Sequence, residues 1–222
     1  LKHSLNAINQ LFKMKYLRDP DAIYKASFEM IAKEIDLSRF PNNLSNLVIR
    51  VVHSMALPEI ADHIVWQGDV AKATEDSLDS GKNIIVDSNM VAAGIMSDKL
   101  SEKCKIYCFI KDKRLPDLAN SLQTTRSAAA VELWKPYLAG AIIIIGNAPT
   151  ALFHLLDMLK DPECPRPSVI YGFPVGFIGA TEAKEELCNS SYGIPFVSLK
   201  GRWGGSPIAS AAINAMLLGE KQ

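Results

Sequence analysis

The sequence lacks any apolar run long enough to cross a membrane, since its longest candidate, residues 139–145, has the length of a strand. It also lacks net charge, because 24 Lys and Arg residues balance 24 Asp and Glu residues. Such a chain has no overall field to attract nucleic acid or an anionic membrane, so neither partner is expected. An anionic ligand must therefore be bound by local cations.

Cysteine and histidine are scarce as well. The four cysteines include no close pair of the kind that ligates a metal, and they are too few for a disulfide-stapled secreted domain. The four histidines are scattered, without a His-x-x-x-His pair, so no metal site is predicted. The first nineteen residues contain no secretory segment, and the cytoplasm is the expected compartment.

What remains is the composition of one compact domain, with 48% hydrophobic and 22% charged residues. We expect this domain to span residues 16–222. Residues 1–15 are expected to form an N-terminal extension, with one helical stripe made by Leu5, Ile8, Leu11 and Phe12.

Five short runs rich in Ile, Val and aromatic residues predict strands at 83–87, 105–110, 141–145, 168–172 and 195–199. Segments of helical length follow several of them, around 116–137, 149–160, 179–188 and 208–218. The alternation of strands and helices predicts an α/β fold, in which a parallel sheet is covered by helices on both faces.

Two further helices are predicted ahead of the sheet. Asp19 and Pro20 form the start of the first, whose stripe carries Ile23, Met30 and Ile31, with Ser27 on the same side. The second begins near residue 41. Its apolar positions recur with helical spacing and predict a core-facing side made by Leu44, Leu47, Val48, Val51, Val52 and Met55.

Arg50 and His53 fall on the opposite side of the second helix, about one turn apart. They point away from the predicted core. One interpretation is a solvated polar face, which needs no function. The other is a functional pair, and this requires a loop or a neighbouring subunit to cover it.

The loops after the predicted strands are the expected ligand site, because parallel sheets bind ligands beyond the carboxyl ends of their strands. These loops contain Asn147, the segment 172–177, and the segment 201–206 with Gly204 and Gly205. The segment 172–177 is equally compatible with a simple tight turn. Arg126 opens a helix and is either an anion-binding residue or a solvated arginine.

Several segments together resemble the precorrin-8X methylmutase family, which includes the cobalt-precorrin-8 methylmutases of the anaerobic route to vitamin B12. The matching segments cover residues 16–20, 23–28, 36–40, 50–53, 125–133, 146–153, 172–179, 182–184 and 201–206. The chain departs from the family after His53, where it has Ser54-Met55-Ala56 in place of a small residue and glycine.

The resemblance implies a flavodoxin-like, doubly wound, five-stranded and mostly parallel sheet. It also implies a homodimer whose active sites lie near the subunit interface, and a polycarboxylate tetrapyrrole as substrate. The implied reaction moves a methyl group from C11 to C12 of the macrocycle, without a cofactor. By the same resemblance His53 is the catalytic acid and base. The expected substrate-binding residues are Ser27, Arg50, Arg126, Asn147, Lys184, Arg202, Gly204 and Gly205.

Two other functions remain open. A non-catalytic corrinoid carrier would use the same pocket without turnover. A flavin- or nucleotide-binding domain is disfavoured, because the chain lacks the Gly-x-Gly-x-x-Gly spacing and the Lys-Ser/Thr pair of phosphate loops.

Overall fold

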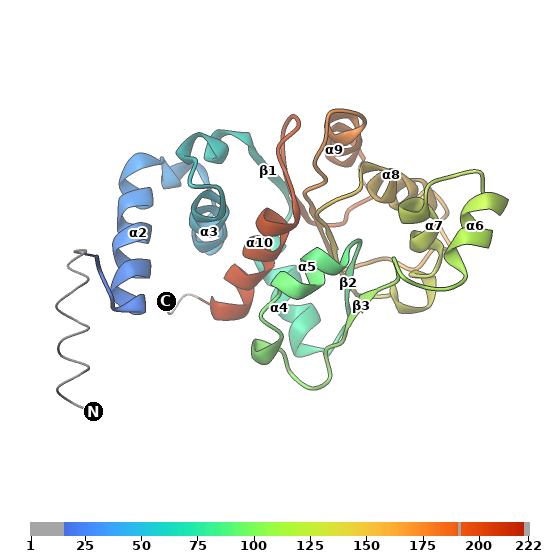
Figure 1. The fold of residues 1–222 in the computed structure, drawn as a ribbon, viewed down its shortest axis with the longest axis horizontal. Helices are drawn as coiled ribbons and strands as arrows, with labels where there is room; N and C mark the ends of the chain where they lie inside the picture. Colours follow the sequence, from blue (N-terminus) through green and yellow to red (C-terminus); the bar gives the residue numbers. More distant parts are fainter. Residues whose placement is uncertain (1–15, 191, 220–222) are drawn as a thin grey trace, which may run out of the picture.

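One mixed sheet of six strands forms the centre of the molecule, in the order β1-β6-β5-β4-β2-β3 (Figure 1). The computed structural model describes residues 16–190 and 192–219. The predicted extension 1–15, with its stripe of Leu5, Ile8, Leu11 and Phe12, lies outside the described residues. The strands are β1 (Ile64–Gln67), β2 (Ile84–Val86), β3 (Ile106–Cys108), β4 (Ile142–Ile145), β5 (Val169–Gly172) and β6 (Phe196–Leu199).

All five predicted strands are confirmed, each within the predicted range. The predicted count is wrong, because β1 adds a sixth strand that pairs antiparallel with β6. Strands β2 to β6 are parallel to one another and run β3-β2-β4-β5-β6 across the sheet. Numbered along the chain, these five follow the order 2-1-3-4-5, an order found in doubly wound sheets.

Helices cover both faces of the sheet, as predicted. Along β4, Ile142 and Ile144 face one apolar cluster, and Ile143 and Ile145 face the other. The helices that follow the first two strands are α4 (Val70–Asp79) and α5 (Asn89–Gly94). Those that follow the other strands are α6 (Leu115–Ser121), α7 (Arg126–Glu132), α8 (Pro149–Met158), α9 (Ala180–Asn189) and α10 (Ser206–Leu218).

The helix prediction differs from the structure in two respects. The segment 116–137 is two helices and a short 3-10 turn, because Gln123 adopts a left-handed φ of 49° and Thr125 caps a new helix. Helices α4 and α5 were not predicted. No helix in the described residues has the length and apolar character needed to cross a bilayer.

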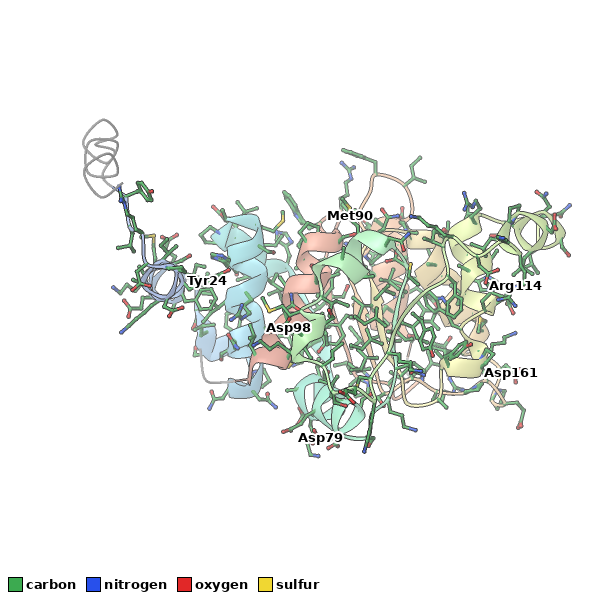
Figure 2. All side chains as sticks on the ribbon, turned by 60° about the horizontal axis from the view of Figure 1, so that its bottom comes forward. Tyr24, Asp79, Met90, Asp98, Arg114 and Asp161 are labelled. Atoms are coloured by element: carbon green, nitrogen blue, oxygen red, sulfur yellow. The ribbon has the colours of Figure 1, made fainter. Side chains whose placement is uncertain are left out.

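Helices α2 (Pro20–Glu34) and α3 (Ser45–Met55) extend the structure beyond the sheet. The predicted cap of α2 is present, since the Asp19 carboxylate accepts a hydrogen bond from the N–H of Asp21. The predicted apolar side of α3 packs into the core, where Leu47, Val48 and Val51 are fully buried. Helix α2 contains no buried residue and lies as an outer layer against α3 (Figures 1 and 2).

Candidate functional site

The side of α3 that faces away from the core carries His53, and α2 covers it. The Ser27 hydroxyl of α2 lies 2.9 Å from His53 Nδ1, within hydrogen-bonding distance. Tyr24, one turn before Ser27 in α2, and Phe28, the residue after it, place their ring centroids 5.7 and 5.4 Å from that of the imidazole. Figure 2 shows Tyr24 on the side of α2 that faces α3. His53 is thus half-buried between two helices, with one ring nitrogen engaged.

Arg50 lies one turn before His53 and is only 8% exposed. Its guanidinium carbon lies 5.1 Å from the centroid of the Phe28 ring, which gives a cation–π contact. Its Nε is buried and has no hydrogen-bond partner among the described residues. Burial lowers the pKa of Arg50, but a guanidinium remains charged in proteins. The interpretation of Arg50 as part of a solvated face is therefore wrong, because α2 covers it within this chain.

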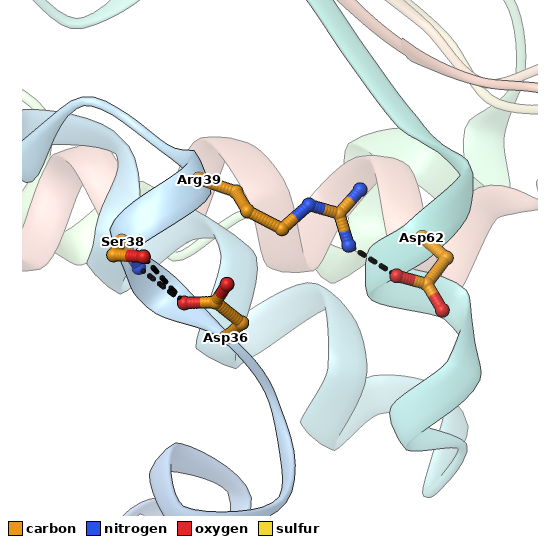
Figure 3. A network of polar contacts seen from close by, with 4 residues as sticks. All are labelled: Asp36, Ser38, Arg39 and Asp62. Atoms are coloured by element: carbon orange, nitrogen blue, oxygen red, sulfur yellow. Dashed lines mark hydrogen bonds and ion pairs between the residues drawn. The ribbon is translucent and has the colours of Figure 1, made fainter.

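The chain between α2 and α3 is held by a small polar network (Figure 3). Asp36 Oδ1 accepts hydrogen bonds from Ser38 Oγ at 2.6 Å and from the Ser38 N–H at 3.0 Å, and these bonds lower the pKa of Asp36. Arg39 forms an ion pair with Asp62, in the 3-10 helix Pro58–His63 that leads into β1. These contacts lie in and beside the turn that leads from α2 to α3.

A second set of predicted residues lies at the carboxyl edge of the parallel strands. Asp87, directly after β2, is 3% exposed. Its carboxylate accepts hydrogen bonds from the N–H groups of Gly146 at 2.9 Å, Asn147 at 2.9 Å and Ala148 at 2.7 Å. Burial raises the pKa of Asp87, and the three backbone donors act in the opposite direction. The Asn147 side chain is exposed at this edge.

Gly204 and Gly205 have conformational reasons to be glycine. A Cβ on Gly204 would lie 2.4 Å from the carbonyl oxygens of Phe173 and Pro174. Gly205 has a φ of 122° and donates its N–H to the Phe173 carbonyl at 2.9 Å. The segment 172–177 and the segment 201–206 therefore pack directly on each other. Gly204 thus has a packing role that the sequence interpretation did not give it, and its expected contact with the substrate stays a prediction.

Lys184 in α9 is 1% exposed, and its Nζ donates to the carbonyl oxygen of Trp203 at 2.5 Å. Burial lowers the pKa of Lys184 to about 8. The amine is thus engaged with the backbone of the 201–206 segment. Arg202, in that same segment, is exposed and lies 5.1 Å from the ring centroid of Phe177.

Arg126 lies apart from these loops. Its Nη2 donates to the carbonyl of Ile110, just beyond β3, at 3.0 Å. Strands β3 and β6 are four positions apart in the sheet, which corresponds to roughly 19 Å at about 4.8 Å per strand. The structure thus gathers Ser27, Arg50 and His53 into one cluster, and Asn147, Lys184, Arg202, Gly204 and Gly205 along the carboxyl edge. No hydrogen bond or ring contact within the described residues joins these two groups.

The geometry also bears on the other binding hypotheses. The amino end of α8 follows the central strand β4, the place where a phosphate would be bound. The Asp87 carboxylate accepts the N–H groups of residues 146–148, directly before α8, and its negative charge beside this helix end disfavours a nucleotide phosphate there. Within residues 16–190 and 192–219, no group of three His, Cys, Asp or Glu side chains is arranged to hold a metal ion.

Sequence reasoning assigned no role to Tyr24, Phe28 or Asp87. The first two shared a signal, since residues 24, 27 and 28 lie on one side of a helix by spacing. The only sequence signal for Asp87 was its position directly after a strand. That position does not show that its carboxylate is buried against the backbone of residues 146–148.

Comparisons with known proteins complete the description. The chain matches the family model CbiC, precorrin-8X methylmutase, over residues 22–218. It is 44% identical over 201 residues to the precorrin-8X methylmutase of Sinorhizobium sp, covering 90% of this chain and 95% of that protein. It is 34% identical over 198 residues to the cobalt-precorrin-8 methylmutase of Priestia megaterium, covering 89% and 87%. A solved "precorrin-8X methylmutase related protein" superimposes with a TM-score of 0.79 at 34% identity, over 86% of this chain and 99% of that chain.

Proposed function

Because the chain belongs to the precorrin-8X methylmutase family, whose members are isomerases of cobalamin biosynthesis, we propose that it moves a methyl group from C11 to C12 of a corrin precursor. The substrate is precorrin-8X or cobalt-precorrin-8, and the product is hydrogenobyrinate or cobyrinate. The reaction is an isomerisation, so it needs no electron acceptor and no added cofactor. The observation that carries the proposal is the cluster of Ser27, Arg50 and His53 between α2 and α3.

His53 is the proposed proton donor and acceptor. An imidazole exchanges a proton near neutral pH, and its Nδ1 is engaged with Ser27. Its Nε2 therefore remains for the macrocycle. Protonation of the macrocycle withdraws electron density from the carbon that the methyl group leaves, and the proton returns to His53 once the new bond has formed. Positioned acid–base catalysis of this kind contributes about 10²- to 10⁴-fold.

Arg50 is the proposed partner of a substrate carboxylate. It is buried, charged and short of a hydrogen-bond acceptor at Nε. A carboxylate accepts hydrogen bonds from a guanidinium in a charge-assisted pair. Arg202 and Arg126, both exposed, are the proposed partners of outer carboxylates, and Asn147 supplies a neutral amide.

We propose a homodimer as the active form, with sites near the interface. The reason is that His53 and the loops at the carboxyl edge form two separate clusters in one chain. The carboxyl edge also exposes large apolar side chains, with Phe177 86% and Ile178 91% exposed, as expected of a surface that contacts another protein. The cytoplasm is the proposed compartment, where the four free cysteines stay reduced.

The experiment is conversion of the purified substrate, followed by absorption spectroscopy, with metal-free and cobalt-loaded forms assayed side by side. The wild-type protein is expected to convert at least one form. The variant His53→Ala is expected to lose about 10²- to 10⁴-fold in kcat while it retains affinity for the product. His154→Ala is the matched control, because that imidazole contacts Glu132 on α7 and takes no part in the site.

Three results would contradict the proposal. Folded wild-type protein that converts neither substrate form has a different activity. A chain that binds corrinoid without turnover is a carrier, and His53→Ala then has no rate to lose. Equal losses of kcat in His53→Ala and His154→Ala would show that the effect is on the fold rather than on the chemistry.

A further inference from the structure

A buried carboxylate and two backbone hydrogen bonds connect the loops that follow four of the parallel strands. Asp87 ends β2 and accepts the three consecutive N–H groups of residues 146–148, directly after β4. The carbonyl of Asn147 in turn accepts the N–H of Val175, in the loop after β5, at 3.4 Å. The loop after β6 joins through Gly205, whose N–H donates to Phe173.

We propose that Asp87 is a positioning residue for the corrinoid surface: by fixing residues 146–148 it sets the relative placement of the loops after β2, β4, β5 and β6. The inference rests on the proposed function, since it concerns the binding surface for that substrate. Asp87 itself is 3% exposed and does not contact the substrate.

The amino end of α8 shows why a carboxylate is needed here. Ala148 stands at the cap position of α8 and provides no side-chain hydrogen bond. The first N–H groups of a helix otherwise lack partners. Asp87, on a neighbouring strand, accepts the N–H of this cap residue and those of the two residues before it, and its negative charge lies at the positive end of the helix dipole. The loop is therefore held in one conformation before any substrate arrives.

The neighbours of Gly146 confine this loop on one side. A Cβ at this position would lie 2.6 Å from Val91 Cγ2 and 2.8 Å from the Cβ of Ala209. Residue 146 is thus confined between α5 and α10, and the peptide that follows it is held by Asp87. A loop that is confined on one side and hydrogen-bonded on the other loses its placement when the hydrogen bonds are removed.

The same arrangement limits where the substrate carboxylates can bind. The N–H groups of residues 146–148 are engaged, and a second anion at the start of α8 would be repelled by Asp87. The carboxylates of the substrate must therefore be bound by side chains such as Arg50 and Arg202. The amino end of α8 contributes shape and the Asn147 amide, and not an anion site.

The variant Asp87→Asn tests the inference. Asparagine has the same size, but both oxygens of Asp87 accept hydrogen bonds. In either orientation of the amide, its NH₂ group therefore faces at least one backbone N–H, and that hydrogen bond is lost. The matched control is Asp69→Asn, which changes the carboxylate that caps α4 by accepting from the N–H of Lys72 at 3.0 Å. Asp69 follows β1, whose last residue Gln67 pairs with the first residue of β6. The control therefore lies at the amino ends of the parallel strands, whereas Asp87 lies at their carboxyl ends.

For Asp87→Asn we expect KM and the Kd for product to rise about tenfold, the cost of one unmade buried hydrogen bond. The value of kcat should stay within about twofold, since His53 is held by α2 and α3 outside this network. Asp69→Asn should lower the melting temperature and leave KM unchanged. Equal KM values in Asp87→Asn and wild type, or equal increases in both variants, would overturn the inference.

Amide hydrogen exchange of the wild-type protein provides a measurement that does not depend on the folding of a variant. The amides of Gly146, Asn147 and Ala148 are expected to exchange at least about 100-fold more slowly than in a free peptide. Exchange at the free-peptide rate would refute the Asp87 contacts. The two proposals fail separately: wild-type protein that neither binds nor converts corrinoid contradicts the proposed function, whereas active wild type with an unaffected Asp87→Asn contradicts only the role of Asp87.

Discussion

Replacement of Ser27 with alanine separates two roles for this residue. The resemblance to the methylmutase family implies that Ser27 binds substrate, whereas its hydroxyl in the structure lies 2.9 Å from Nδ1 of His53. If the hydroxyl orients the imidazole, its loss affects the proton transfer. If it binds substrate, its loss affects affinity. The two roles therefore predict different kinetic constants.

The structure favours an effect on kcat. A neutral hydrogen bond contributes about 1 kcal/mol net, and a loss of that size in the transition state lowers kcat roughly five- to tenfold. The Tyr24 and Phe28 rings still contact the imidazole in Ser27→Ala, so His53 remains in place but is free to turn and to exchange its tautomer. Stability should change little, because Ser27 is only partly buried and α2 contains no fully buried residue.

The assay is steady-state kinetics of Ser27→Ala and Ser27→Thr across a pH range, with the melting temperature measured for both. We expect Ser27→Ala to lose five- to tenfold in kcat, with KM changed less than about twofold. Ser27→Thr restores a hydroxyl and should recover most of the rate. The reasoning is refuted if Ser27→Ala keeps the wild-type kcat and instead raises KM.

Three further predictions concern binding, packing and pH. Arg50→Met should raise KM by roughly 10- to 100-fold, as expected for a lost charge-assisted pair. It should not lower the melting temperature, because it removes a buried donor that has no partner. A fall in kcat with an unchanged KM would contradict this prediction. Gly204→Ala should lower the free energy of unfolding by about 1–3 kcal/mol, measured by urea denaturation, since its Cβ meets two carbonyl oxygens. Burial lowers the pKa of Lys184 to about 8, so between pH 8 and 10 the unfolded chain holds a proton on Lys184 that the folded chain releases. The free energy of unfolding of wild type should therefore rise with pH relative to that of Lys184→Met. If the free energy of unfolding has the same pH dependence in both proteins, the burial of this amine is contradicted.

The parts of the fold that sequence predicted are those with a strong local signal. The buried run 142–145 has no solvent-facing side and could only be a central strand. The apolar spacing of α3 was equally clear. Strand β1 was missed because it has four residues, lies at an edge and exists only through its pairing with β6, more than a hundred residues away. Its residues Ile64, Val65 and Trp66 favour a strand, but so short a run does not establish one without the pairing.

The site was predictable in its residue types but not in its arrangement. Helical spacing placed Arg50 and His53 together, and the resemblance added Ser27. Nothing in the sequence shows that α2 packs against α3, because helical spacing gives the sides of each helix but not the direction of the turn between them. The carboxylate of Asp87 was missed for a similar reason, since its partners are backbone N–H groups, which every residue except proline has.

The buried charged side chains differ in whether they have hydrogen-bond partners within the chain. Three charged side chains are buried in the described part of the chain: Arg50, Asp87 and Lys184. Asp87 and Lys184 are engaged with backbone groups of the carboxyl-edge loops, whereas Arg50 has a ring contact and an Nε without an acceptor. Burial has already removed water from Arg50, so a carboxylate that reaches it gains a strong hydrogen bond without displacing solvent from the guanidinium. An exposed arginine such as Arg202 must first lose its own water, and it therefore contributes less affinity per contact.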